Sequence, residues 1–337
     1  MNLPGLLVLA CAVCAAEAPR SASPSDAFLP DTIHRPPVER GSERKRERVV
    51  EHDSIVYVAP AERLSIHRVS APPAGKAGTR EPTHIVLLPG PVGSAFSMRH
   101  ITATLGARGL PVLVIDPLGM GRSAHPAHAD YSLTAQARRI EAVLDTLRVS
   151  RALVVAQGTS ATVALRLAAV SPERIVGVLS LAGGPIDRQE TTGVRLALAL
   201  APLLDNPLGR AIGRRRFLAA VREQSASPAW CTPDIAARYL APVEADLRGT
   251  FRTLRAMQAA VEPTRIETVL RQVRAPVHLL VGDHRTSHAP TAAQVTLLQH
   301  HLSAFTVDTV SGAGTMLHEE RADAIVEAVL AMLARDG

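Results

Sequence analysis

The feature that most constrains the fold is a series of short, continuous apolar runs separated by segments of helical periodicity. Seven runs follow one another along the chain. They are RLSIHRV (63–69), HIVLLPG (84–90), PVLVIDPLG (111–119), ALVVAQG (152–158), IVGVLSLAGG (175–184), VHLLVGD (277–283) and FTVDTVSGAG (305–314). Helical patterns occupy 134–149 and 161–174 between them. Strands that are apolar on both faces need helices on both sides, so the pattern predicts an α/β fold with a mostly parallel, doubly wound sheet.

The alternation stops between Gly184 and about Arg274, where helical sequence dominates. We therefore predict a helical cap over 185–274, inserted into a core formed by 48–184 and 275–337. Within the cap, Thr232 is suited to cap a helix whose first turn contains Pro233. The chain has 337 residues, 47% of them hydrophobic and 20% charged, which suffices for one large domain with an insertion.

The N-terminus favours export. Residues 1–18 read as a signal peptide or lipoprotein leader, with an apolar run that ends in the small-residue sequence AEA at 16–18. The sequence VLAC also makes Cys11 a lipidation candidate. The protein is then periplasmic or secreted, as a lipoprotein if Cys11 is lipidated; the alternative is a cytoplasmic protein with an apolar leader. Residues 19–47 are rich in Pro, Ser and charge and read as a disordered basic linker.

Charge and composition narrow the range of partners. The net charge of +6 comes from scattered arginines, and aromatic residues make up only 3% of the chain, so we expect no nucleic-acid partner. We expect membrane contact only through a lipid at Cys11. No cofactor is expected, and His284 and His288 lack a third nearby ligand, so no metal site is expected.

Five motifs in order resemble the α/β-hydrolase fold family, in its capped, esterase-like or dehalogenase-like form. They are LLPGPVGSAF (87–96), DPLGMGRS (116–123), ALVVAQG (152–158), LLVGDHR (279–285) and GAGTMLHEE (312–320). The resemblance extends from about His67 to Leu333. It implies a nucleophile on a sharp turn between a strand and a helix, a histidine base and a carboxylate that orients the histidine.

At these three positions the sequence departs from the family pattern. The nucleophile position falls on Gly158, which has no side chain. Thr315 stands where the family has its histidine, and a threonine hydroxyl is no base near neutral pH. Arg285 stands at the position of the acid and cannot accept a hydrogen bond. We therefore expect a degenerate, non-hydrolytic protein that keeps a cleft between sheet and cap and binds a small apolar ligand or a protein partner.

The oxyanion loop also departs from the pattern, because its donor position is Pro91, which has no N–H, although Thr159 still offers its amide. The alternative is an active esterase-like serine hydrolase that uses displaced residues. Its candidates are Ser160 as nucleophile, His318 as base, and Asp283 or Asp187 as acid. The simpler interpretation makes Ser160 a small residue in the first turn of a helix. It gives His318, which Glu319 and Glu320 follow, a capping or surface role.

Overall fold

The computed structural model describes residues 50–70, 82–188, 206–284 and 286–336. The predicted leader at 1–18, with Cys11, and the predicted linker at 19–47 lie outside these residues, as does Arg285. Residues 47–337 form one compact unit, separate from 1–46, and the description concerns that unit.

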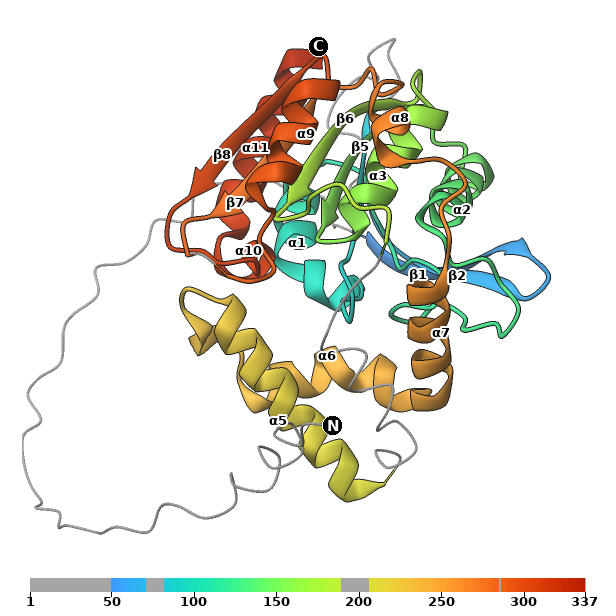
Figure 1. Ribbon diagram of the computed structural model, residues 1–337, viewed down its shortest axis with the longest axis vertical. Helices are drawn as coiled ribbons and strands as arrows, with labels where there is room; N and C mark the ends of the chain where they lie inside the picture. Colours follow the sequence, from blue (N-terminus) through green and yellow to red (C-terminus); the bar gives the residue numbers. More distant parts are fainter. Residues whose placement is uncertain (1–49, 71–81, 189–205, 285, 337) are drawn as a thin grey trace, which may run out of the picture. The chain divides into compact units, whose positions relative to one another are not determined.

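The predicted sheet is present and has eight strands in the order β1-β2-β4-β3-β5-β6-β7-β8 (Figure 1). The pairs from β4 to β8 are all parallel, whereas β1 and β2 join antiparallel at one edge. The strands are β1 (Val50–Ala59), β2 (Glu62–Ser70), β3 (His84–Leu88), β4 (Val112–Ile115), β5 (Ala152–Gln157), β6 (Ile175–Leu181), β7 (Val277–Gly282) and β8 (Phe305–Val310). The mostly parallel sheet is thus confirmed.

Helices cover both faces of the sheet, as the apolar strands require. One apolar core includes side chains of α1 (Arg99–Ala107) and α11 (Ala322–Asp336). The other core includes side chains of α2 (Leu133–Thr146), α3 (Ser160–Val170), α8 (Ile266–Leu270) and α9 (Ala292–His301). Two separate cores, one on each side of the strands, are the mark of a doubly wound sheet.

Helices of a cap lie between β6 and β7. They are α5 (Pro207–Gln224), α6 (Pro233–Ala245) and α7 (Leu247–Ala259), grouped together in Figure 1. Thr232 caps α6 as expected, because its hydroxyl accepts the N–H of Ile235, and Pro233 takes the first turn. The helix α8 falls within the range predicted for the cap, but it packs on the core helices α3 and α9.

The sequence analysis did not predict the strand β1. β1 alternates polar and apolar residues, and its burial is mostly partial or absent, so it lacks the continuous apolar run that marks β3 to β7. It pairs only with β2, at the edge of the sheet, where one face and one backbone edge meet solvent. Among the described residues, no helix combines the length and the apolar character needed to span a bilayer.

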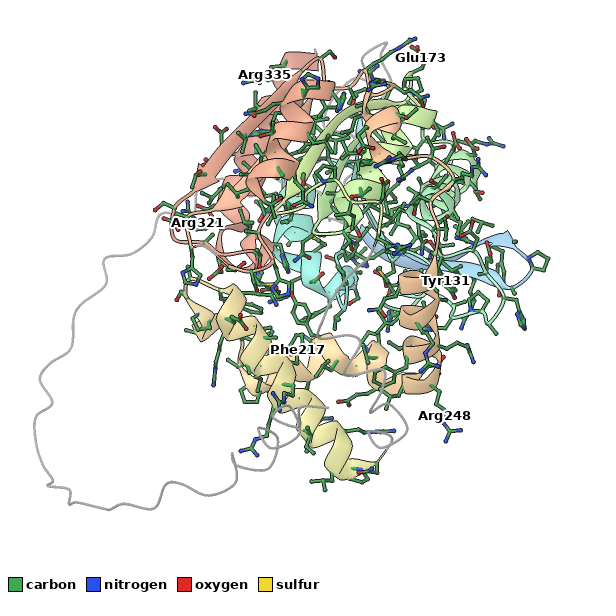
Figure 2. All side chains as sticks on the ribbon, viewed as in Figure 1. Tyr131, Glu173, Phe217, Arg248, Arg321 and Arg335 are labelled. Carbon is green, nitrogen blue, oxygen red and sulfur yellow. The ribbon has the colours of Figure 1, made fainter. Side chains whose placement is uncertain are left out.

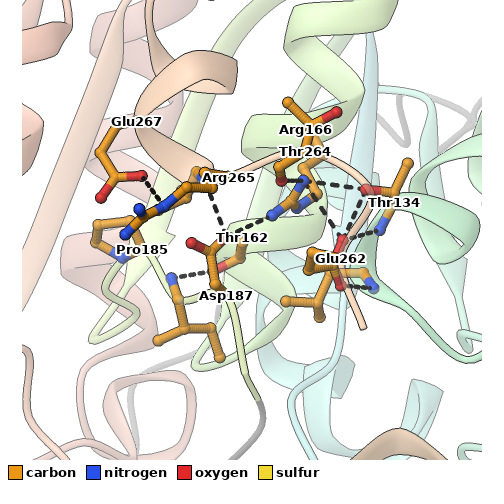
Figure 3. Close-up of polar contacts among 12 residues, drawn as sticks. Thr134, Thr162, Arg166, Pro185, Asp187, Glu262, Thr264, Arg265 and Glu267 are labelled. Carbon is orange, nitrogen blue, oxygen red and sulfur yellow. Dashed lines mark hydrogen bonds and ion pairs between the residues drawn. The ribbon is translucent and has the colours of Figure 1, made fainter. Parts of the chain in front are cut away.

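A buried arginine in α3 joins two helix N-termini to the core (Figure 3). The Arg166 side chain is only 2% exposed and pairs with Asp187 at 2.9 Å and with Glu262 at 3.4 Å. Glu262 accepts the backbone N–H groups of Leu133 and Thr134 at the start of α2. Asp187 accepts the N–H of Ile266 at the start of α8. Arg166 is therefore the shared counter-ion of two carboxylates that each cap a helix.

Candidate active site

The turn between β5 and α3 has the geometry of a nucleophile elbow. Gly158 lies between the last residue of β5 and the start of α3, and its φ is +55°, in the left-handed region that favours glycine. Its N–H donates to the Leu181 carbonyl at the end of β6, at 3.0 Å. A Cβ built on Gly158 would meet only the Pro91 Cδ within 4 Å, at 3.8 Å. The turn therefore has space for a side chain but carries none.

The structure brings the loop that holds the histidine position to the same edge of the sheet. The amide of Gln157, next to Gly158, donates to the sulfur of Met316, next to Thr315, at 3.9 Å. Parallel strands end together, so the elbow after β5 and the loop after β8 meet here. The predicted positions 158 and 315 thus lie on neighbouring segments, but neither side chain supplies a nucleophile or a base.

The oxyanion loop lies against the elbow. Pro91, the residue at the donor position, is exposed and has no N–H to offer an oxyanion. Gly90 donates its N–H to the Gln157 side chain at 3.3 Å. The Thr159 hydroxyl is buried without a hydrogen-bond partner. The loop therefore contacts the elbow, and Pro91, the predicted donor position, has no N–H to donate.

Ser160, the displaced-nucleophile candidate, begins α3, as the simpler interpretation expected. Its side chain is buried, at 1% exposure, and its hydroxyl donates to the Pro89 carbonyl at 2.6 Å. The hydroxyl therefore ties the elbow helix to the oxyanion loop.

Thr315 lies against the end of the cap helix α5. Its backbone N–H donates to the Gln224 carbonyl at 2.9 Å, and its hydroxyl is 3.3 Å from the Gln224 side-chain oxygen. Gly314 is glycine by necessity, because a Cβ there would collide with the Gln224 carbonyl. The cap helix α5 therefore contacts Thr315, the position that the sequence analysis predicts for the histidine.

His318 is not on the surface, so the surface role inferred from its acidic neighbours is wrong. Its side chain is only 1% exposed. Its Nε2 lies 3.1 Å from the Tyr239 hydroxyl of α6, and its Nδ1 has no hydrogen-bond partner. Burial lowers the pKa of His318 to about 4, so the ring is neutral at physiological pH. It belongs to the short helix α10 (Leu317–Glu320) that precedes α11.

Next to His318, a buried carboxylate joins cap to core. Glu319 accepts two hydrogen bonds from Arg99 of α1, at 2.6 and 2.7 Å, and one from the Tyr239 hydroxyl. The Glu319 side chain is fully buried. We call Arg99, Tyr239, His318 and Glu319 the Glu319 cluster. Sequence reasoning missed its partners, because Glu319 looked like an ordinary acid in the first turn of a helix.

Aromatic rings surround Tyr239 of this cluster. Phe96 lies at 5.6 Å in an edge-to-face contact, Phe217 at 5.7 Å and Trp230 at 6.1 Å between ring centroids. Figure 2 shows Phe217 in the cap, on α5. The Trp230 Nε1 is buried without a hydrogen-bond partner. The chain has one tryptophan, so Trp230 reports optically on this contact.

Within the described part of the chain, the acid candidates Asp283 and Asp187 are hydrogen-bonded to other residues and not to His318. Asp283 is exposed and accepts from the Gly312 N–H at 3.0 Å and the Ser311 hydroxyl at 2.9 Å. These bonds, that of Gly312 above all, hold its pKa below the ordinary value. Asp187 is engaged by Arg166. Across the described ranges, no three His, Cys, Asp or Glu side chains gather as metal ligands would.

The motif DPLGMGRS forms a tight structural turn. The Asp116 carboxylate is buried and accepts the Arg122 N–H at 2.9 Å, and the Ser123 hydroxyl donates to the Asp116 carbonyl at 2.6 Å. Gly121 has a φ of +53°, and a Cβ there would collide with the Asp116 carboxylate. Burial raises the pKa of Asp116 to about 7.

Comparison with known proteins agrees with this geometry. The family model described as "Alpha/beta hydrolase family" matches residues 85–328, and the chain belongs to that family. Among solved structures, the enol-lactonase from Burkholderia xenovorans is 20% identical, with a TM-score of 0.64, and the match covers 83% of this chain and 100% of that one. The epoxide hydrolase CorEH is 18% identical, with a TM-score of 0.64, and the match covers 86% and 100% of the two chains. A thioesterase domain from the curacin biosynthetic pathway is 15% identical, with a TM-score of 0.59 and coverages of 84% and 99%. Likeness at these identities shows the fold.

Proposed function

We propose that this protein is a non-hydrolytic member of its family that binds a small, largely apolar ligand where the cap meets the elbow. The observation that carries the proposal is Gly158, which has the left-handed conformation of the elbow but no side chain to attack a carbonyl. Nucleophilic catalysis in this fold needs that side chain and an adjacent base. Thr315, bonded to the cap at Gln224, supplies no base.

The alternative, an esterase-like hydrolase with displaced residues, has less support from the contacts. The Ser160 hydroxyl is bonded to Pro89, the His318 Nε2 faces Tyr239, and Asp283 faces Ser311 and Gly312. Within the described part of the chain, no hydrogen bond joins any two of these three residues. A working triad requires the nucleophile to bond the base and the base to bond the acid.

Three buried polar atoms without partners support ligand binding. They are the Thr159 hydroxyl at the elbow, the His318 Nδ1 and the Trp230 Nε1. A buried polar group that makes no hydrogen bond lowers the stability of the folded state. A ligand whose polar end hydrogen-bonds one of these atoms would therefore be favoured. The rings of Phe96, Phe217 and Tyr239 suit an apolar body. A protein partner has no separate observation in its favour, and export of the chain stays a prediction.

Active-site labelling separates the two functions. We expect the full chain to resist a fluorophosphonate that reacts with activated serines, because Ser160 is buried and its proton is held by the Pro89 carbonyl. Labelling is read by intact-protein mass spectrometry, beside an active serine esterase as the positive control. Stoichiometric labelling that disappears in Ser160→Ala would establish the displaced-residue hydrolase instead.

Ligand binding is tested with 1-octanol, which combines an apolar chain with one hydroxyl. We expect a saturable change in Trp230 fluorescence, and an affinity about fivefold weaker in Thr159→Val, since one hydrogen bond contributes about 1 kcal/mol. Thr146→Val is the matched control, because Thr146 is an exposed threonine whose hydroxyl bonds its own helix. A signal that only rises linearly with octanol, or an equal loss in both variants, would refute the site.

A further inference from the structure

The cap helix α5 carries an outward stripe that the proposed function does not use. Its members recur at the spacing of one helical face, and all are exposed. They are Leu208, Ile212, Arg215, Ala219 and Arg222, which we call the α5 stripe. Leu208 is 71% exposed and Ile212 is 45% exposed. Large aliphatic side chains one turn apart and open to solvent mark an interaction surface.

The stripe lies opposite the face that packs within the cap. Phe217 and Val221 point inward, and Phe217 contacts the ring of Tyr239 in α6. At 100° per residue, Phe217 lies about half a turn away from Leu208 around the helix axis. Leu208 and Ile212 therefore point away from the face of α5 that packs on α6.

The charge of α5 identifies the class of partner. The helix has five arginines, at 210, 214, 215, 216 and 222, and one acid, Glu223. Arg214 pairs with Glu244 of α6, at 2.7 Å. Arg215 and Arg216 are exposed directly beside the two aliphatic residues. A second copy docked through the same stripe would bring arginines against arginines, so the charge favours an anionic partner.

We propose that the α5 stripe binds the surface of an anionic phospholipid bilayer, with Leu208 and Ile212 inserted at the level of the headgroups. Exposed aliphatic residues with arginines beside them on one helix suit contact with the headgroup level of an anionic bilayer. The arginine side chains reach the phosphates while their methylene stems stay beside the inserted residues. This contact needs no lipid on Cys11 and holds the cap, not the core, against the membrane.

Vesicle co-sedimentation tests the proposal with the full chain. We expect binding to vesicles of phosphatidylcholine with phosphatidylglycerol, weak binding to phosphatidylcholine alone, and loss of binding in high salt. Leu208→Ser with Ile212→Ser should weaken binding at least about tenfold, from the apolar area lost. Arg215→Gln with Arg216→Gln should weaken it at least about tenfold, because two attractions to the anionic headgroups are lost. The basic run at 40–48 is present in every variant, so its own effect cancels.

Matched controls remove exposed residues of the same types elsewhere. Val170→Ser with Val307→Ser removes two exposed aliphatic side chains, and Arg108→Gln with Arg138→Gln removes two exposed charges. We expect both controls to bind like the natural chain, and circular dichroism to show that all variants fold. Vesicle binding that is absent, or equal in stripe variants and controls, would overturn the proposal. Self-association that Leu208→Ser with Ile212→Ser abolishes, without vesicle binding, would assign the stripe to a second copy instead.

Discussion

Replacing Arg166 by methionine should lower the free energy of unfolding by about 4 kcal/mol, the largest effect we expect from any single substitution outside the apolar core. The reason is that the substitution leaves the buried carboxylate of Glu262 without its counter-ion. Glu262 is 5% exposed and would keep its charge in the core without a counter-ion. Removal of one member of a buried ion pair costs about 3–5 kcal/mol, whereas an exposed pair contributes about 1 kcal/mol or less. The measurement is urea denaturation followed by far-ultraviolet circular dichroism.

A double-mutant comparison isolates the cause. Glu262→Gln in the Arg166→Met background should recover part of the lost stability, because the uncompensated charge is then gone while the amide oxygen still accepts from the start of α2. Arg274→Gln is the control, since Arg274 pairs with Glu173 on the surface and both side chains are mostly exposed. If the double variant is no more stable than Arg166→Met, the charge of Glu262 is not what destabilises the single variant.

The pH dependence of stability should contain two opposite slopes, one from Asp116 and one from His318. The pKa of Asp116 is about 7 in the folded protein against an ordinary value of 3.8. Between these values the folded state keeps a proton that the unfolded state has lost, so the free energy of unfolding falls as the pH rises. The slope is about 1.4 kcal/mol per pH unit. Asp116→Asn should remove this fall.

His318 acts in the other direction. Its pKa is about 4 when folded and ordinarily 6.5, so between these values only the unfolded state binds the proton. Its contribution to stability is complete above pH 6.5 and is lost as the pH falls toward 4. The contributions of Asp116 and His318 therefore nearly cancel from pH 4 to 6.5 in the natural chain. His318→Gln should expose the fall due to Asp116, and Asp116→Asn the rise due to His318.

Urea denaturation at a series of pH values between 4 and 7 checks this, read as the difference between each variant and the natural chain. Each difference should change by about 3 kcal/mol across the window, with opposite signs. Asp283→Asn is the control, because Asp283 is exposed and its lowered pKa lies below the window. Difference curves that stay flat for Asp116→Asn and His318→Gln would contradict the assignment of both groups.

The sequence predicted the sheet well where strands are buried on both faces. The runs that contain β3 to β7 are continuous and apolar because helices cover them on both sides, and each run was recognised. The run that contains β8 was also recognised, although β8 forms the other edge of the sheet and most of its residues are exposed. β1 was missed because most of its residues are exposed at the edge of the sheet, and the polar residues among them interrupt its apolar pattern. The sequence also did not predict that α8 packs on the core. Whether a helix between two strands belongs to the cap or to the core depends on contacts between residues far apart in the sequence.

At the site, the sequence located the elbow because the strand and the helix on either side fix the turn between them. The Glu319 cluster was not found, because Arg99 and Tyr239 are 220 and 80 residues from Glu319 along the chain and no local pattern relates them. The sequence contains a signal that Arg166 is buried and paired, which the sequence analysis did not use. It is a lone charge within the apolar helix sequence SATVALRLAAV, and a charge among apolar residues on every side needs a buried partner.

The left-handed turn at Gly158 sets an energetic cost on any side chain placed at that position. A residue with a side chain pays about 1–2 kcal/mol to hold this conformation, and glycine holds it without that cost. Gly158→Ser would therefore reduce the free energy of unfolding, and Thr315 would still offer the new hydroxyl no base. A nucleophile at this turn and a base beside it would therefore have to be introduced together before their joint effect could offset that cost.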